Sequence, residues 1–135
     1  MRALRWLLLL VAVGASGALA VVLSLCFVSA ANAFCPANEL VSGVCTAHWA
    51  SAAYSTGFCI ATSIGAVLAV LSAYYISPAG RQLATWCFVA VGAVFAVYLC
   101  QGVPAWEFFP AIAIAAVVAF ILTRHASLDT RLQNA

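Results

Sequence analysis

The chain has 135 residues, of which 67% are hydrophobic and 6% are charged, and its mean hydropathy is +1.17. Soluble domains carry about 25% charged residues, so this composition excludes an ordinary soluble domain and predicts an integral membrane protein. The formal net charge of +2 is too small, and its basic residues too scattered, to indicate nucleic-acid binding.

The charged residues divide the chain into long uncharged stretches at 6–38, 40–80, 82–106 and 108–123. A helix needs about 20 apolar residues to cross the hydrocarbon core of a bilayer, and open sheet edges cannot be satisfied in lipid. We therefore predict an all-α membrane protein, with a single domain (1–135) of four transmembrane helices in an antiparallel bundle. The helices are expected at about 6–30, 49–76, 83–101 and 107–124.

The placement of the charges predicts the orientation of this bundle. The arginines precede the first stretch, separate the second from the third and follow the fourth: Arg2, Arg5, Arg81 and Arg124. Glu39 and Glu107 fall in the other two connections. Because positive residues stay on the cytoplasmic side, we expect both termini in the cytoplasm and both glutamates outside. The expected location is a bacterial inner (plasma) membrane.

The first predicted helix has some features of a signal peptide. Arg2 and Arg5 precede an apolar run, and Ala31-Asn32-Ala33 matches a small-residue cleavage pattern. The apolar run extends over 6–28, however, and the hydrophobic core of a signal peptide has only about 7–15 residues. We interpret the segment as a retained helix.

Two of the six cysteines, Cys35 and Cys45, lie in the first outer connection. A non-cytoplasmic compartment oxidises such pairs, so a disulfide is expected between them. The alternative is a redox-active pair of the kind used by membrane thiol oxidases, which are also small four-helix bundles. Those enzymes use Cys-x-x-Cys, and this spacing does not occur in the chain. A structural disulfide is therefore the favoured interpretation.

Three titratable residues, Glu39, His48 and Glu107, are expected near the outer membrane face and form a possible outer polar site. A metal site needs several His, Cys or carboxylate ligands at close spacing, and one histidine without a His-x-x-x-His or Glu-x-x-His pattern does not supply them. We favour solvated interfacial residues, and we expect neither a metal nor a cofactor.

The second predicted helix carries small residues at every fourth position: Ala53, Gly57, Ala61, Gly65, Ala69 and Ala73. Such a face lets another helix backbone approach closely, and close packing is a main source of helix association in lipid. The first helix has a lesser series at Ala12, Ser16, Ala20 and Ser24. These two helices are the expected close pair, although the pattern alone leaves a contact between chains open.

The predicted spans contain no charged residue at mid-depth. Ionisable residues inside the membrane mark ion pathways and proton relays, so a proton-coupled transporter is disfavoured.

The preferred function is that of a non-enzymatic membrane protein acting through helix contacts, as an accessory subunit or assembly factor or as a small homo-oligomer. Its partners would be the bilayer and other membrane subunits or itself. The alternatives are a small oligomeric transporter or channel for a neutral or small solute, and a thiol or quinone oxidoreductase using the outer cysteines.

Overall fold

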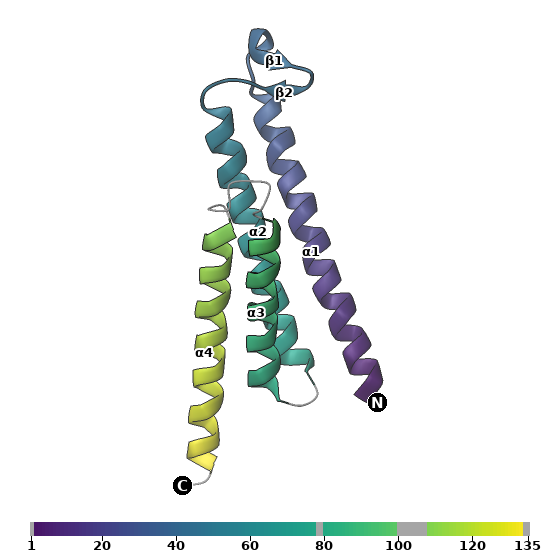
Figure 1. The fold of residues 1–135 in the computed structure, drawn as a ribbon, viewed down its shortest axis with the longest axis vertical. Helices are drawn as coiled ribbons and strands as arrows, with labels where there is room; N and C mark the ends of the chain where they lie inside the picture. Colours follow the sequence, from purple (N-terminus) through teal and green to yellow (C-terminus); the bar gives the residue numbers. More distant parts are fainter. Residues whose placement is uncertain (1, 78–79, 100–107, 134–135) are drawn as a thin grey trace.

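The computed structural model describes residues 2–77, 80–99 and 108–133. Its four α-helices are α1 (Arg2–Ala33), α2 (Ala50–Ile76), α3 (Arg81–Leu99) and α4 (Phe109–Gln133), as Figure 1 shows. A short 3-10 helix, η1 (Ala37–Glu39), and a two-stranded ribbon of β1 (Leu40–Val41) and β2 (Val44–Cys45) connect α1 to α2. The predicted all-α class and the four helices are confirmed for this part of the chain.

Two of the four helices are long and apolar enough to cross a membrane, namely the segments Leu4–Ala33 of α1 and Ala50–Ile76 of α2. The 32 residues of α1 extend over about 48 Å at ~1.5 Å per residue. The apolar parts of α3 and α4, Gln82–Tyr98 and Phe109–His125, are shorter. By length and composition alone, the structure supports two candidate spans.

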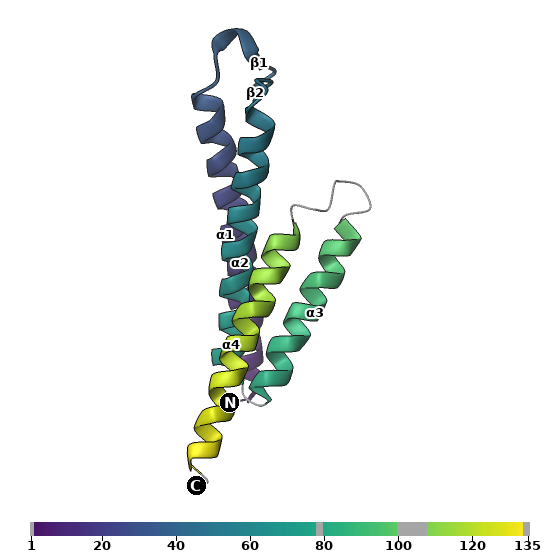
Figure 2. The same cartoon turned by 90° about the vertical axis from the view of Figure 1, so that its left-hand side faces the viewer.

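α2 is the central helix of the molecule. It packs along α1 on one side and against α3 and α4 on the other, whereas α1 makes no comparable contact with α3 or α4. Figure 2 shows α3 standing away from the α1–α2 pair towards its own C-terminal end. The N-terminal end of α1, the C-terminal end of α2 and the C-terminal end of α4 lie at one end of the molecule, and the ribbon lies at the other (Figure 1).

The small-residue face of α2 lies mostly inside the molecule. Gly57, Ala61, Gly65 and Ala73 are buried, and Ala53 and Ala69 are half-buried.

Gly57 and Gly65 mark the closest approach between α2 and α1. A Cβ atom on Gly57 would lie 2.7 Å from the Cβ of Phe27, and one on Gly65 would lie 2.8 Å from the Cβ of Ala20 and 3.3 Å from the carbonyl oxygen of Ser16. These distances leave no room for a side chain at either position.

A second, smaller seam joins α2 to α4. Val70 of α2 is buried together with Ala115 and Ala119 of α4. The ring of Phe58 of α2 also meets the ring of Phe108, which immediately precedes α4. The two rings are edge to face with centroids 5.2 Å apart, an arrangement that aromatic pairs prefer. The α3–α4 hairpin is thus attached to the rest of the molecule mainly through α2.

Three element boundaries differ from the sequence-based expectation. α1 occupies 2–33 rather than 6–30, and α4 continues to Gln133, past the predicted end at 124. Neither extension contains Gly or Pro, so nothing in the local sequence ends the helix there.

The two strands were not predicted. Between them Ser42 and Gly43 have φ of 53° and 81°, the paired positive values of a two-residue hairpin turn.

Candidate functional site: an apolar cavity below a crosslinked cap

A cavity of about 410 Å³ lies between the four helices and is partly open to the surroundings. All four contribute to its lining, and small residues make the space: Gly17 and Ala20 of α1, Gly65 and Ala66 of α2, Gly92 of α3 and Ala115 of α4. No side-chain or backbone atom of a neighbouring element lies within 4 Å of where a Cβ of Gly17 or Gly92 would stand. The cavity therefore exists because side chains are missing at facing positions.

Because the cavity is partly open, molecules from the surroundings of the protein can enter it. Its volume of about 410 Å³ also falls within the range of ligand pockets, about 300–1,000 Å³.

The polar side chains on the cavity wall are already hydrogen-bonded to their own helices. The Ser16 hydroxyl donates to the carbonyl oxygen of Val13 at 2.7 Å, and the Thr62 hydroxyl donates to the carbonyl oxygen of Phe58 at 2.8 Å. A buried water molecule needs two to four polar partners. Because both hydroxyls already donate to their own helices, neither has a hydrogen left to donate to a water molecule. The cavity is suited to hydrocarbon rather than to water or a polar solute.

Above the cavity, a disulfide between Cys35 and Cys45 closes the connection from α1 to α2. Cys35 follows the end of α1, and Cys45 is the last residue of β2, paired with Leu40 across the ribbon. Cys45 is 4% exposed and packs with Ala47 and Ala50 at the start of α2. We call residues 32–54 of this end of the molecule the outer cap.

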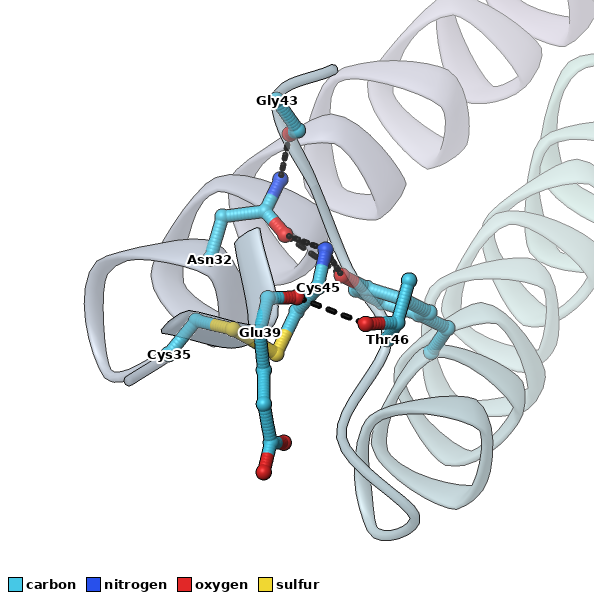
Figure 3. Close-up of a disulfide and its surroundings, with 7 residues drawn as sticks. Asn32, Cys35, Glu39, Gly43, Cys45 and Thr46 are labelled. Atoms are coloured by element: carbon cyan, nitrogen blue, oxygen red, sulfur yellow. Dashed lines mark hydrogen bonds between the residues drawn. A yellow bond between two sulfur atoms is a disulfide. The ribbon is translucent and has the colours of Figure 1, made fainter. Parts of the chain in front are cut away.

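Asn32 and Tyr54 hold the outer cap together by hydrogen bonds. Figure 3 shows Asn32 beside Gly43, Cys45 and the disulfide. The Asn32 amide donates to the carbonyl oxygen of Gly43 at 3.1 Å. The Cys45 N–H donates to both the Asn32 side-chain oxygen and the Tyr54 hydroxyl oxygen, each at 3.1 Å. The Tyr54 hydroxyl in turn donates to the Asn32 side-chain oxygen. One asparagine at the end of α1 thus positions the ribbon and the first turns of α2.

Replacing Asn32 by Ala is expected to lower the unfolding free energy by about 1–2 kcal/mol, because the Tyr54 hydroxyl loses its acceptor and the Gly43 carbonyl loses the Asn32 donor. Reversible unfolding in mixed detergent micelles measures the change. The same substitution at Asn38, which is exposed in η1, is the matched control and should have little effect. Equal losses at the two positions would show that Asn32 does not organise the outer cap.

Two of the three residues of the predicted outer polar site, Glu39 and His48, belong to the outer cap. Glu39 is half-buried, and His48 is exposed. The Glu39 carboxylate points away from Asn32 and Cys45 in Figure 3, while its backbone carbonyl accepts bonds from the Thr46 N–H and hydroxyl at 2.9 and 2.7 Å. Glu107 lies outside the described residues. Among the described residues, no three His, Cys, Asp or Glu side chains form a group that could hold a metal.

The remaining cysteines do not extend the disulfide into a described cluster. Cys26 of α1 and Cys87 of α3 are exposed free thiols, and Cys59 of α2 is half-buried and is not disulfide-bonded. Cys100 lies outside the described residues.

Sequence reasoning missed the cavity and the Asn32–Tyr54 pair. The pair is 22 residues apart in the chain, and nothing in either segment indicates that the two side chains meet. Comparisons with protein-family models, with curated proteins and with solved structures find no match to this chain. Its function is therefore inferred from the cavity, the outer cap and the exposed surface.

Proposed function

We propose that the chain is a non-enzymatic membrane protein with four transmembrane helices that works through helix contacts within the bilayer. It would serve as an accessory subunit or assembly factor of a larger membrane complex, or as a small homo-oligomer. The observation that carries this proposal is the chemistry of the exposed surface. Large apolar side chains are exposed along α1 and α3, including Leu10, Val11, Val94 and Phe95, each 60% exposed or more. Soluble monomers rarely expose apolar patches of more than a few hundred Å².

The exposed face of α3 gives the proposal its most specific support. Leu83, Val91, Val94, Val97 and Tyr98 are each at least 65% exposed. Among the described helices, α3 packs mainly against α2 and α4, so this exposed face is available to lipid or to an apolar helix of another chain. Its apolar part is near the lower limit of about 17–25 residues for a spanning helix, and a partner helix would shield its ends.

The arrangement of charges and the disulfide supports an orientation with both termini in the cytoplasm. Arg2 and Arg5 belong to the first turn of α1 and Arg124 to the C-terminal half of α4, on one side of the molecule, and the disulfide lies at the opposite end (Figure 1). Arginine collects on the cytoplasmic side, and disulfides persist in oxidising compartments such as the periplasm. A bacterial inner membrane provides both environments.

The two alternative functions draw less support from the geometry. The cavity wall gives a polar solute few hydrogen-bond partners, which disfavours a solute path within one chain. The Cys35–Cys45 disulfide sits inside a hydrogen-bonded cap, which favours a structural bond over a redox-active one.

Native mass spectrometry of the protein released from its own membrane in a mild detergent tests the proposal. We expect the 14.0 kDa chain to appear in a stable assembly, either with another membrane protein or with further copies of itself. A control variant, Val94→Glu, places a charge on the exposed face of α3 and should release the chain from that assembly. A wild-type chain found only as a monomer contradicts a function through helix contacts.

A further inference from the structure

The cavity has a lateral entrance. α1 and α3 both line it, through residues such as Gly17 and Gly92, yet these two helices make no contact comparable with those of α2. Figure 2 shows α3 diverging from the α1–α2 pair along its length. From this arrangement we infer that the partly open cavity opens between α1 and α3, sideways, towards the space that the hydrocarbon core of a bilayer would occupy.

Both helices carry exposed apolar side chains outside the cavity lining. Val21 and Val22 of α1 and Val91 of α3 are each more than half exposed, and the cavity wall on α2 includes the half-buried Ala66 and Ala69. A flexible hydrocarbon chain could pass from the lipid-facing surface to the cavity without meeting a charged group. An apolar cavity of only about 150 Å³ already stays dry and takes up an apolar molecule, and this cavity is more than twice as large.

From these observations we propose that the cavity is a binding site for one acyl chain of a membrane phospholipid, which enters between α1 and α3 and contacts α2. The proposal rests on the membrane residence proposed above and goes beyond it. α2 packs against α1, α3 and α4, so a chain that enters the cavity contacts its half-buried wall residues Ala66 and Ala69. The bound chain fills the space beside Gly17 and Gly92 and joins the α3–α4 hairpin to α1.

Photocrosslinking from within the bilayer tests this site. The full chain is reconstituted in phosphatidylcholine vesicles in which a fraction of the lipid carries a diazirine midway along one acyl chain. After irradiation, peptide mass spectrometry locates the adducts. Within the segment 66–70 of α2, we expect adducts on the cavity residues Ala66, Ala69 and Val70, and these are the positions scored. We also expect adducts on the exposed Val22 of α1, which reports contact with bulk lipid.

A pair of cavity-filling variants and a matched control make the test specific. Gly92→Leu and Gly17→Leu place a side chain in the cavity without a clash, and Gly14→Leu adds the same side chain on an open face of α1 outside the cavity. In the first two, adducts on 66–70 should fall by about an order of magnitude, because a close-packed space excludes the chain. Adducts on Val22 should persist in all three, and circular dichroism confirms that each variant remains helical.

The outcomes separate this proposal from the proposed function. Adducts on Val22 without adducts on 66–70 overturn the acyl-chain site and leave the membrane protein intact. The site is also overturned if labelling of 66–70 survives both Gly92→Leu and Gly17→Leu. An absence of adducts on Val22 and on 66–70 alike would mean that the chain does not reside in the bilayer, which contradicts the proposed function itself.

Discussion

Replacing Gly65 by Leu is expected to force α1 away from α2 and to lower the unfolding free energy by about 3 kcal/mol or more. The first added atom already lies 2.8 Å from the Cβ of Ala20 and 3.3 Å from the carbonyl oxygen of Ser16. Neither atom can rotate aside, because one is fixed to the backbone and the other belongs to it. In lipid, close packing of this kind is a main source of helix association, so the loss should be large. Reversible unfolding in mixed micelles measures it.

Two further substitutions sharpen this prediction. Gly57→Leu should be similarly damaging, because a Cβ there lies 2.7 Å from that of Phe27. Gly14→Leu is the matched control, since a Cβ at position 14 meets nothing within 4 Å, and it should be tolerated. Comparable folded yields for Gly14→Leu, Gly57→Leu and Gly65→Leu would show that the small-residue face of α2 does not hold α1.

The double substitution Cys35→Ala/Cys45→Ala is expected to lower the unfolding free energy by about 2–3 kcal/mol in the chain-entropy model. The disulfide closes a segment whose ends are ten residues apart, so its loss frees the unfolded chain. The buried position of residue 45 and the hydrogen bonds of its backbone N–H to Asn32 and Tyr54 should keep the two-stranded ribbon folded in this variant. The same unfolding measurement, with and without reductant, determines the effect.

Cys87→Ala provides the control for this substitution, because Cys87 is an exposed free thiol on α3 and its removal should leave stability unchanged. Mass spectrometry of unreduced peptides should find Cys35 linked to Cys45. A linkage between Cys45 and Cys59, or stability that does not depend on the pair, would remove the structural role of the disulfide and favour the thiol oxidoreductase alternative.

Charge and hydropathy were sufficient to predict the helices, because the bilayer constrains them so strongly. Uncharged stretches such as 40–80 and 82–106 leave few other structures once lipid is the solvent. The end of the connection before α3 is also predictable from the sequence, because it contains Gly80. This residue adopts φ of 65°, a conformation that glycine accepts without strain. Helix ends were less predictable, since the extensions of α1 and α4 depend on the absence of a stop signal rather than on the presence of one.

The outer cap and the cavity depend on contacts that no local pattern encodes. Ser42-Gly43 between two short apolar pairs is a signal for a hairpin, so the ribbon could have been found. The Asn32–Tyr54 pair could not, because it joins the end of one helix to the start of another. The cavity requires Gly17 and Gly92 to face each other across the bundle, and their relative position follows only from how α1 and α3 both pack around α2.

A lysine-labelling experiment tests most directly whether the chain crosses the membrane with both termini in the cytoplasm. The native sequence contains no lysine, so one introduced lysine supplies the sole side-chain amine. His48 and Gln82 are both exposed and lie on opposite sides of the proposed bilayer. In intact cells, a membrane-impermeant amine reagent should modify His48→Lys and should reach Gln82→Lys only after permeabilisation. Modification of Gln82→Lys in intact cells would contradict the proposed four-span arrangement with both termini in the cytoplasm.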